Sequence, residues 1–153
     1  MRVSAKTDYA LRAAVELASA VDTGAPVKGE KLATSQHIPL RFLENILLQL
    51  RHAGIIESRR GADGGYKLAR APEEITLADV IRAIDGPLAG VSGQRPETLD
   101  FKGTSEPLRE VWIAVRASLR SVLERVTLAD VVAGELPDHV RTMLGDEDAW
   151  VTH

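Results

Sequence analysis

The fold is decided by one stretch, IPLRFLENILLQLRHAGIIESRRGADGGY, which spans residues 38–66. Its first half carries apolar residues at the i, i+3, i+4 and i+7 spacing of one helix face, namely Leu43, Ile46, Leu47 and Leu50. The opposite face of this predicted helix is polar apart from Leu48, and it holds Arg41, Glu44, Asn45 and His52. Gly54 then marks the end of the helix.

A short hairpin is predicted directly after this helix. Residues 55–60 have the composition of a strand and finish in two cations, Arg59 and Arg60. Gly61, Gly64 and Gly65 allow a tight reversal, and residues 66–68 return as a second strand. A helix with a polar face, followed by a basic-tipped hairpin, is the pattern of a winged helix–turn–helix. We therefore interpret residues 38–66 as a surface that binds duplex DNA.

The polar side chains of this stretch have chemistry that suits base edges. Arg pairs with guanine, Asn with adenine, and Glu accepts a hydrogen bond from cytosine, so the side chains predicted to read bases are Arg41, Glu44 and Asn45. Cations at a wing tip enter the minor groove or hold a phosphate. The other candidate DNA-binding residues are Lys28, Arg51, Arg59, Arg60 and Tyr66. The alternative is a solvated polar face, but the turn before the helix and the hairpin after it favour DNA binding.

Two helices are predicted before this stretch. The first spans residues 4–20, with Ser4 as its cap and an apolar stripe at Leu11, Ala14, Val15, Ala18 and Val21. Near its start, Arg2 and Lys6 are either phosphate contacts or solvated cations. The second helix spans residues 28–34, with Leu32 and Ala33 facing inward, and residues 35–39 form the turn that follows. Two helices joined by a short turn form the unit that docks on the major groove.

A further helix and a long loop are predicted after the hairpin. Residues 76–85 begin with Thr76 and Asp79 at capping-box spacing and are stopped by Gly86 and Pro87. Residues 88–105 are rich in Gly, Pro, Ser and Thr and show no period, so they are predicted to be a loop. Loops of this length in compact domains are usually functional or disordered.

The longest predicted helix spans residues 106–125, and its apolar positions follow the helical period nearly throughout. Such a helix packs either on its own domain or on a second copy. We favour a second copy, because DNA-binding modules of this size usually read two half-sites. The candidate dimerisation residues are Leu108, Val111, Trp112, Val115, Leu119 and Val122. Residues 127–131 repeat the TLADV of residues 76–80 as the start of a short helix, and residues 135–153 are expected to be an acidic tail.

Charge is distributed unevenly along the chain. Residues 1–70 carry 11 Lys and Arg against 7 Asp and Glu, whereas residues 71–153 carry 8 against 15. A basic first half fits a polyanionic partner. Cysteine is absent, which excludes disulfides and thiolate metal sites. No apolar run is long enough to span a bilayer, and the N-terminus reads as an amphipathic helix, so we expect a cytoplasmic protein without a membrane partner.

Four motifs resemble the Rrf-two (Rrf2) family of bacterial winged-helix transcription regulators, which includes the IscR, NsrR and CymR types. The motifs are SAKTDYALRA, LENILLQLRHAGIIESRRGADGGYKLAR, ITLADVIRAIDG, and EPLREVWIAV followed by TLADV, and they cover roughly residues 1–134. The resemblance implies a homodimer whose long helices cross and whose winged helices read a pseudo-palindromic operator. It also implies that Glu44 and Asn45 lie at recognition-helix positions, Arg41 at a base-reading position and Arg60 at the wing arginine.

The chain departs from this family pattern in one loop. Many members carry three cysteines before the dimerisation helix and bind an iron–sulfur cluster there, but residues 88–105 contain no cysteine. A thiolate-held cluster is therefore excluded. An unusual member uses Glu and His ligands in part, and Asp8 and His37 are the residues that could imitate them. We expect instead a regulator with no cofactor and no metal, whose loop binds a small-molecule or protein effector or is a vestige.

These observations predict a mainly α fold with a small β-wing. Its expected parts are a winged helix–turn–helix domain (residues 1–86), an effector loop (87–105), a dimerisation helix with a short following helix (106–134) and a tail (135–153). The expected function is that of a homodimeric, sequence-specific transcriptional regulator, acting as a repressor, and not that of an enzyme. The alternative is a protein-interaction module controlled by a partner enzyme, with weak or lost DNA binding. Arg59 and Arg60 at the wing favour the regulator.

Overall fold

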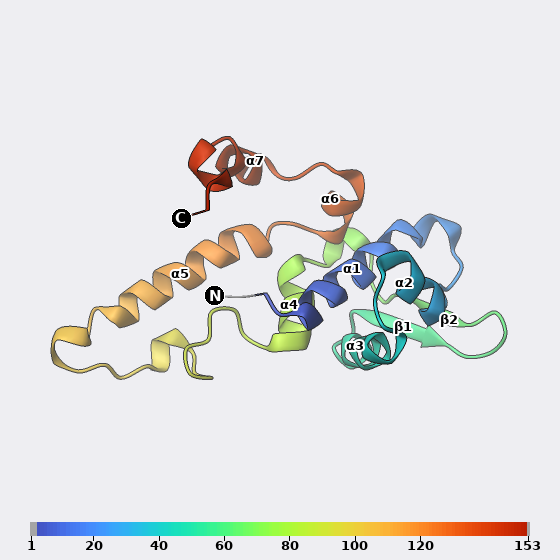
Figure 1. The fold of residues 1–153 in the computed structure, drawn as a ribbon, viewed down its shortest axis with the longest axis horizontal. Coiled ribbons are helices and arrows are strands. Elements are labelled where there is room, and N and C mark those ends of the chain that lie inside the picture. The colour runs from blue at the N-terminus through green and yellow to red at the C-terminus, as the bar shows by residue number, and fades with distance from the viewer. Residues whose placement is uncertain (1–2, 153) are drawn as a thin grey trace.

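The hydrophobic core forms where three helices pack against one another: α1 (Ala5–Ser19), α3 (Leu40–His52) and α4 (Leu77–Asp85). The computed structural model describes residues 3–152, and Figure 1 shows these helices gathered beside a small sheet. Met1, Arg2 and His153 lie outside the described residues, so the prediction for Arg2 is not addressed. The fold is mainly α with one two-stranded antiparallel sheet, as the sequence predicted.

The first helix begins where the sequence predicted but turns a different face to the core. The Ser4 hydroxyl accepts a hydrogen bond from the Thr7 N–H at 3.1 Å, which confirms Ser4 as the cap. The predicted stripe was partly wrong, because Val21 lies in a separate 3₁₀ turn (Val21–Thr23) and is exposed. The side chains of α1 that are buried are Thr7, Ala10, Ala13, Ala14, Leu17 and Ala18.

The helix–turn–helix consists of α2 (Gly29–Gln36) and α3. Leu32 and Ala33 face inward, and the four apolar residues predicted on α3 are all fully buried. The turn between the helices is shorter than predicted and passes through His37, whose φ of 54° lies in the left-handed region. His37 thus reverses the chain at a position where glycine is the usual residue.

The wing is a hairpin of β1 (Ile56–Arg59) and β2 (Gly65–Leu68), paired in the register Ile56 to Leu68 and Arg59 to Gly65. Gly64 and Gly65 are required by close backbone approaches rather than by flexibility. A Cβ at Gly64 would lie 2.2 Å from the carbonyl oxygen of Arg59, and one at Gly65 would lie 2.5 Å from that of Val27. Val27 adds a third extended segment through reciprocal 2.8 Å hydrogen bonds with Tyr66.

Two identical capping boxes join the chain before and after the long helix. Thr76 caps α4, Thr127 caps α6 (Leu128–Ala133), and the Thr–Asp pairing predicted for Thr76 is present in both. The two caps form an antiparallel bridge, in which the Leu77 N–H donates to Val126 and the Leu128 N–H donates to Ile75. Leu128 is fully buried in the core, so α6 packs with the winged-helix domain.

The segment between α4 and the long helix is a loop, interrupted by 3₁₀ turns at Pro96–Thr98 and Gly103–Ser105; a further such turn, Pro72–Glu74, precedes α4. Leu88 and Pro96 are buried, and the first of the loop's turns packs against α5 (Leu108–Leu123). Helix α5 runs outward from the core in Figure 1, so that its N-terminal end lies far from the wing.

The stretch that we expected to be a tail contains regular structure. Residues Asp138–Leu144 form α7, and Glu147–Trp150 form a 3₁₀ turn. Val140 is buried, and a ring nitrogen of His139 lies 2.8 Å from the carbonyl oxygen of Ser121. The C-terminal segment is therefore tied to α5. Among residues 3–152, no helix has both the length and the apolar character needed to cross a membrane.

Candidate nucleic-acid interface

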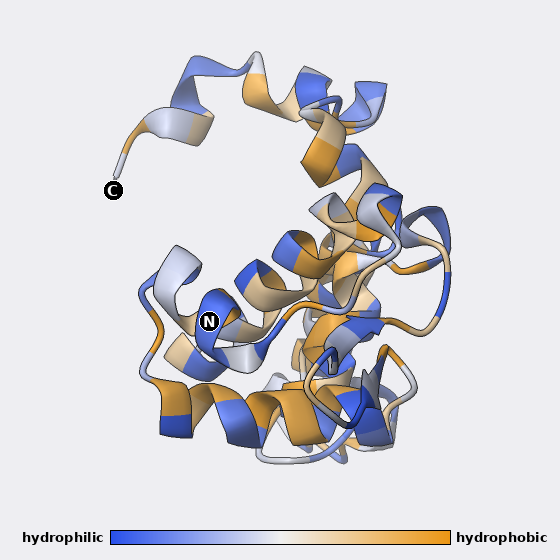
Figure 2. Cartoon of the chain, turned by 90° about the vertical axis from the view of Figure 1, so that its right-hand side faces the viewer, coloured by the Kyte–Doolittle hydropathy of each residue, from blue (hydrophilic) through white to orange (hydrophobic). Residues whose placement is uncertain are grey.

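The exposed face of α3 carries the predicted base-reading side chains. Arg41, Glu44 and Asn45 are all exposed, because the buried residues of the same helix lie on its other side. Figure 2 shows hydrophobic and hydrophilic residues alternating along α3, which runs along the bottom of that view. Leu48 is also exposed, at 42%. This face therefore offers a guanidinium, a carboxylate, an amide and one apolar group, the set of contacts that the major groove can distinguish.

A groove separates this face from the wing and brings the predicted cations together. It is lined by residues of α2, α3 and both strands, including Lys28, Glu44, Arg51, Arg59 and Arg60. All four of these cations are exposed. The Arg51 guanidinium donates a 3.2 Å hydrogen bond to the Ser58 hydroxyl, which fixes it between α3 and β1. A positively charged groove beside a helix with a polar face is suited to a phosphate backbone.

Tyr66 differs from the other candidate residues because it also has a structural role. It is half-buried, its backbone pairs with Val27, and its ring lies over the start of α2, where a Cβ at Gly29 would be 3.5 Å from the ring carbon Cε2. The ring also lines the groove. Tyr66 therefore holds the wing against α2, at the point where Lys28 begins that helix.

The sequence argument missed one polar residue of this face and one aromatic contact. Gln49 donates a 3.0 Å hydrogen bond to the Asn45 side-chain oxygen, and their i, i+4 spacing was a signal that could have revealed this contact. Phe42, on α3, is 42% exposed and meets the Tyr9 ring edge to face at 5.7 Å, and no sequence pattern marked this pair. Gln49 thus positions the amide of Asn45 on the exposed face.

The predicted dimerisation residues form an apolar surface on α5. None of the 16 residues of this helix is buried; Leu108 and Val111 are 43% and 50% exposed, and the other four candidates are half-buried. A groove of ≈700 Å³ runs along this surface and is closed on its other side by Val3, Leu11 and Ile81. An apolar helix face of this extent is typical of a protein interface.

The residues that are present do not fit an iron–sulfur cluster. The loop at 88–105 offers Glu97 and Asp100 but no thiolate, and Glu97 is paired with Arg116. Within residues 3–152, no three His, Cys, Asp or Glu side chains gather as a metal site would require. Asp8, one of the two residues considered as substitute ligands, forms a 2.6 Å ion pair with Arg12. No step of the function is therefore assigned to such a group.

A helix–turn–helix followed by a two-stranded wing defines this chain as a winged-helix DNA-binding protein. It belongs to the Rrf2 family, whose model, described as "Iron-dependent Transcriptional regulator", matches residues 3–134. The chain is thus a transcriptional regulator with a DNA-binding winged-helix fold, and not an enzyme.

Relatives of known name agree with this assignment. An HTH-type transcriptional regulator of Mycobacterium tuberculosis is 51% identical over 146 residues, which cover 95% of this chain and 90% of the relative. The regulator CymR of Bacillus subtilis is 35% identical over 133 residues, covering 87% and 91% of the two chains. The solved structure of that CymR, called the global cysteine regulator, has a TM-score of 0.73 at 33% identity, with 87% of this chain and 97% of that one covered. The structure of IscR from T. potens has a TM-score of 0.71 at 34% identity, with 88% of each chain covered.

Proposed function

We propose that the chain acts as a homodimeric repressor that reads a pseudo-palindromic operator. Helix α3 enters the major groove, and the wing places Arg59 and Arg60 at the neighbouring minor groove. The observation that carries the proposal is the continuity of the two surfaces: the exposed polar face of α3 and the wing cations border one groove. Arg41, Glu44 and Asn45 read bases, while Lys28 and Arg51 hold phosphates.

The homodimer is supported by the surface of α5. A helix of 16 residues with no buried side chain makes few contacts with its own chain, and its apolar side needs a cover. A second copy of α5 supplies a cover of matching length and character. The resulting two-fold pair carries two reading heads, which accounts for a pseudo-palindromic operator.

Control of this repressor is proposed to run without a metal cofactor. The chain has no cysteine, and its loop at 87–105 packs against α5 through Pro96–Thr98. A small-molecule or protein effector that binds at this loop would therefore act next to the dimer interface. Since its partner is bacterial DNA, we place the protein in the cytoplasm.

The test begins with selection of bound fragments from genomic DNA by the full-length protein. A shift assay on the selected fragment then compares the wild type with three single variants, Arg41→Ala, Glu44→Ala and Arg60→Ala. Each variant is expected to weaken binding, while Arg141→Ala in α7, which removes an equally exposed cation far from α3, leaves it unchanged. If all three variants bound like the wild type, the reading surface would be misassigned. Sedimentation of the free protein checks the dimer, and a promoter fusion checks repression.

A further inference from the structure

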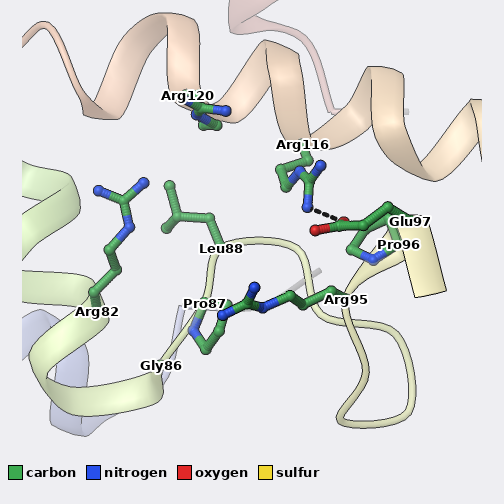
Figure 3. A pocket seen from close by; sticks show the side chains of 9 residues that line it. All are labelled: Arg82, Gly86, Pro87, Leu88, Arg95, Pro96, Glu97, Arg116 and Arg120. Atoms are coloured by element: carbon green, nitrogen blue, oxygen red, sulfur yellow. Dashed lines mark hydrogen bonds and ion pairs between the residues drawn. The ribbon is translucent and has the colours of Figure 1, made fainter.

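A pocket rich in arginine lies between α4, the loop after it and α5 (Figure 3). Its volume is ≈510 Å³, which is within the range of small-molecule sites. Arg82 comes from α4, Arg95 from the loop, and Arg116 and Arg120 from successive turns of α5. Leu88 and Pro96 supply its apolar wall. Three separate elements thus direct four guanidinium groups to one hollow.

The concentration of cations in this pocket runs against the charge of its surroundings. Residues 71–153 contain 8 basic and 15 acidic residues, yet four of the eight basic residues line this single cavity. Two carboxylates offset them. Glu97 pairs with Arg116, and Oε1 of Glu124 accepts hydrogen bonds from both Arg82 and Arg120, the latter at 2.9 Å. The four arginines therefore exceed the carboxylates that pair with them by two positive charges.

Two of the arginines are available to a ligand without loss of a structural contact. Among residues 3–152, the Arg95 guanidinium has no hydrogen bond or ion pair. Arg120 has a side chain that is 52% exposed, and it shares Glu124 with Arg82, which holds the same oxygen without it. Arg116 is the most enclosed of the three arginines that form ion pairs, with 23% of its side chain exposed, and Glu97 now occupies it. An anion that enters the pocket can therefore bind Arg95 and Arg120 and take the place of Glu97.

We propose that the arginine pocket binds a small polyanion that carries at least two phosphate or carboxylate groups. Guanidinium groups bind such oxygens in bidentate fashion, and several of them around one cavity match more than one anionic group. This inference deepens the effector part of the proposed function and rests on it only there. The pocket joins α4 of the reading domain to α5, so a bound anion touches both. Duplex DNA is not the favoured occupant, because the site is a cavity and the wing lies toward the other end of the molecule (Figure 1).

The proposal is tested by calorimetric titration of the full-length protein with pyrophosphate and, separately, with citrate, at constant ionic strength. The double variant Arg95→Gln/Arg120→Gln is expected to lose roughly ten-fold or more in affinity, since each charge-assisted hydrogen bond lost costs about one such factor. Its matched control, Arg109→Gln/Arg125→Gln, removes two exposed arginines of the same helix region outside the pocket and is expected to bind like the wild type. Glu97→Gln is expected to bind more tightly, because it frees Arg116 and removes a competing charge.

The outcomes separate this proposal from the proposed function. Tighter binding of pyrophosphate would assign a phosphate compound, and tighter binding of citrate a polycarboxylate. The absence of binding to either probe, or equal losses in the pocket and control variants, would overturn the proposal. So would a result in which only DNA fragments bind in a way that depends on Arg95 and Arg120. No operator is present in the titrations, so their failure would leave the DNA-binding proposal standing.

Discussion

At the scale of single residues, the wing depends on Gly64 for steric reasons. Its hydrogen atoms face the Arg59 carbonyl oxygen, where a Cβ would lie at 2.2 Å, well inside any normal contact. The obstacle is backbone on both sides of the turn, so no side-chain rotation relieves it. We expect Gly64→Ala to lower the free energy of unfolding by about 1–3 kcal/mol, the usual cost of overpacking. Chemical denaturation measures this loss, and Ala62→Ser, an exposed change in the same turn, should leave stability close to that of the wild type.

Base-reading and phosphate-binding residues should be distinguishable by the kind of affinity that they lose. Arg41→Ala is expected to remove about 1–3 kcal/mol of discrimination at one base pair, because a bidentate contact with guanine is lost. Lys28→Ala should weaken binding to all sequences alike and lower the slope of log affinity against log salt by about 1. Shift assays with single-base operator variants at several salt concentrations measure both effects. The assignments would fail if Lys28→Ala altered base preference and Arg41→Ala did not.

Glu124 should make stability depend on pH in the acid range. Hydrogen bonds from Arg82 and then Arg120 lower the pKa of its carboxyl below the ordinary value of 4.5. The unfolded chain therefore takes up this proton at a higher pH than the folded chain. The stabilisation is present above about pH 4.5 and is lost as the pH falls through the lowered pKa. Urea denaturation should find Glu124→Gln less stable than the wild type at pH 7, with the difference shrinking toward pH 3; a constant difference would contradict the pairing.

At the scale of elements, the paired caps of α4 and α6 make a stability prediction. The Thr127 hydroxyl accepts the Asp130 N–H at 3.1 Å, and the Asp130 carboxylate accepts the Thr127 N–H at 2.8 Å. Thr127→Ala removes one half of this box and should cost about 0.5–2 kcal/mol in unfolding free energy. Thr142→Ala in α7 removes a hydroxyl bonded only to a carbonyl of its own helix and should cost less. Thermal melts of both variants decide whether the cap matters.

The elements that the sequence predicted well are those with strong local signals. The apolar face of α3, the Thr–Asp cap of α4 and the glycine turn of the wing are each set by residues close together in the chain, and all three are present. The face of α1 was harder to predict, because alanines line most of its buried side and their small size lets α4 and α6 approach closely. Helix α7 was missed because its apolar pattern is short.

The site was predictable by residue type but not by arrangement. The groove that joins Lys28 to the wing depends on the Val27–Tyr66 bridge, which links residues 39 positions apart. The arginine pocket depends on α5 folding back beside a loop that has no periodic pattern. Neither contact leaves a trace in local spacing, because each is made by tertiary packing.

At the scale of the whole molecule, the position of α5 determines the assembly. Val111 is half exposed in the single chain, so a charge there should leave the fold intact and disrupt only an interface. Val111→Asp is expected to convert the dimer to a monomer in sedimentation measurements and to weaken operator binding, since each half-site is then bound alone. Ile113→Asp places the same charge at another exposed position on the helix, away from the apolar face, and should remain dimeric. Equal behaviour of the two variants would argue against α5 as the interface.

The bridge between the two threonine caps has a geometric consequence for such a dimer. Because Thr76 and Thr127 hold the C-terminal end of α5 against the reading domain, the helix leaves that domain from a fixed point. Each residue along it adds 1.5 Å of length and 100° of rotation. In a pair of chains joined through α5, the number of residues between the caps and the crossing point therefore acts as a ruler. It sets how far apart the two copies of α3 stand, and so how many base pairs separate the half-sites.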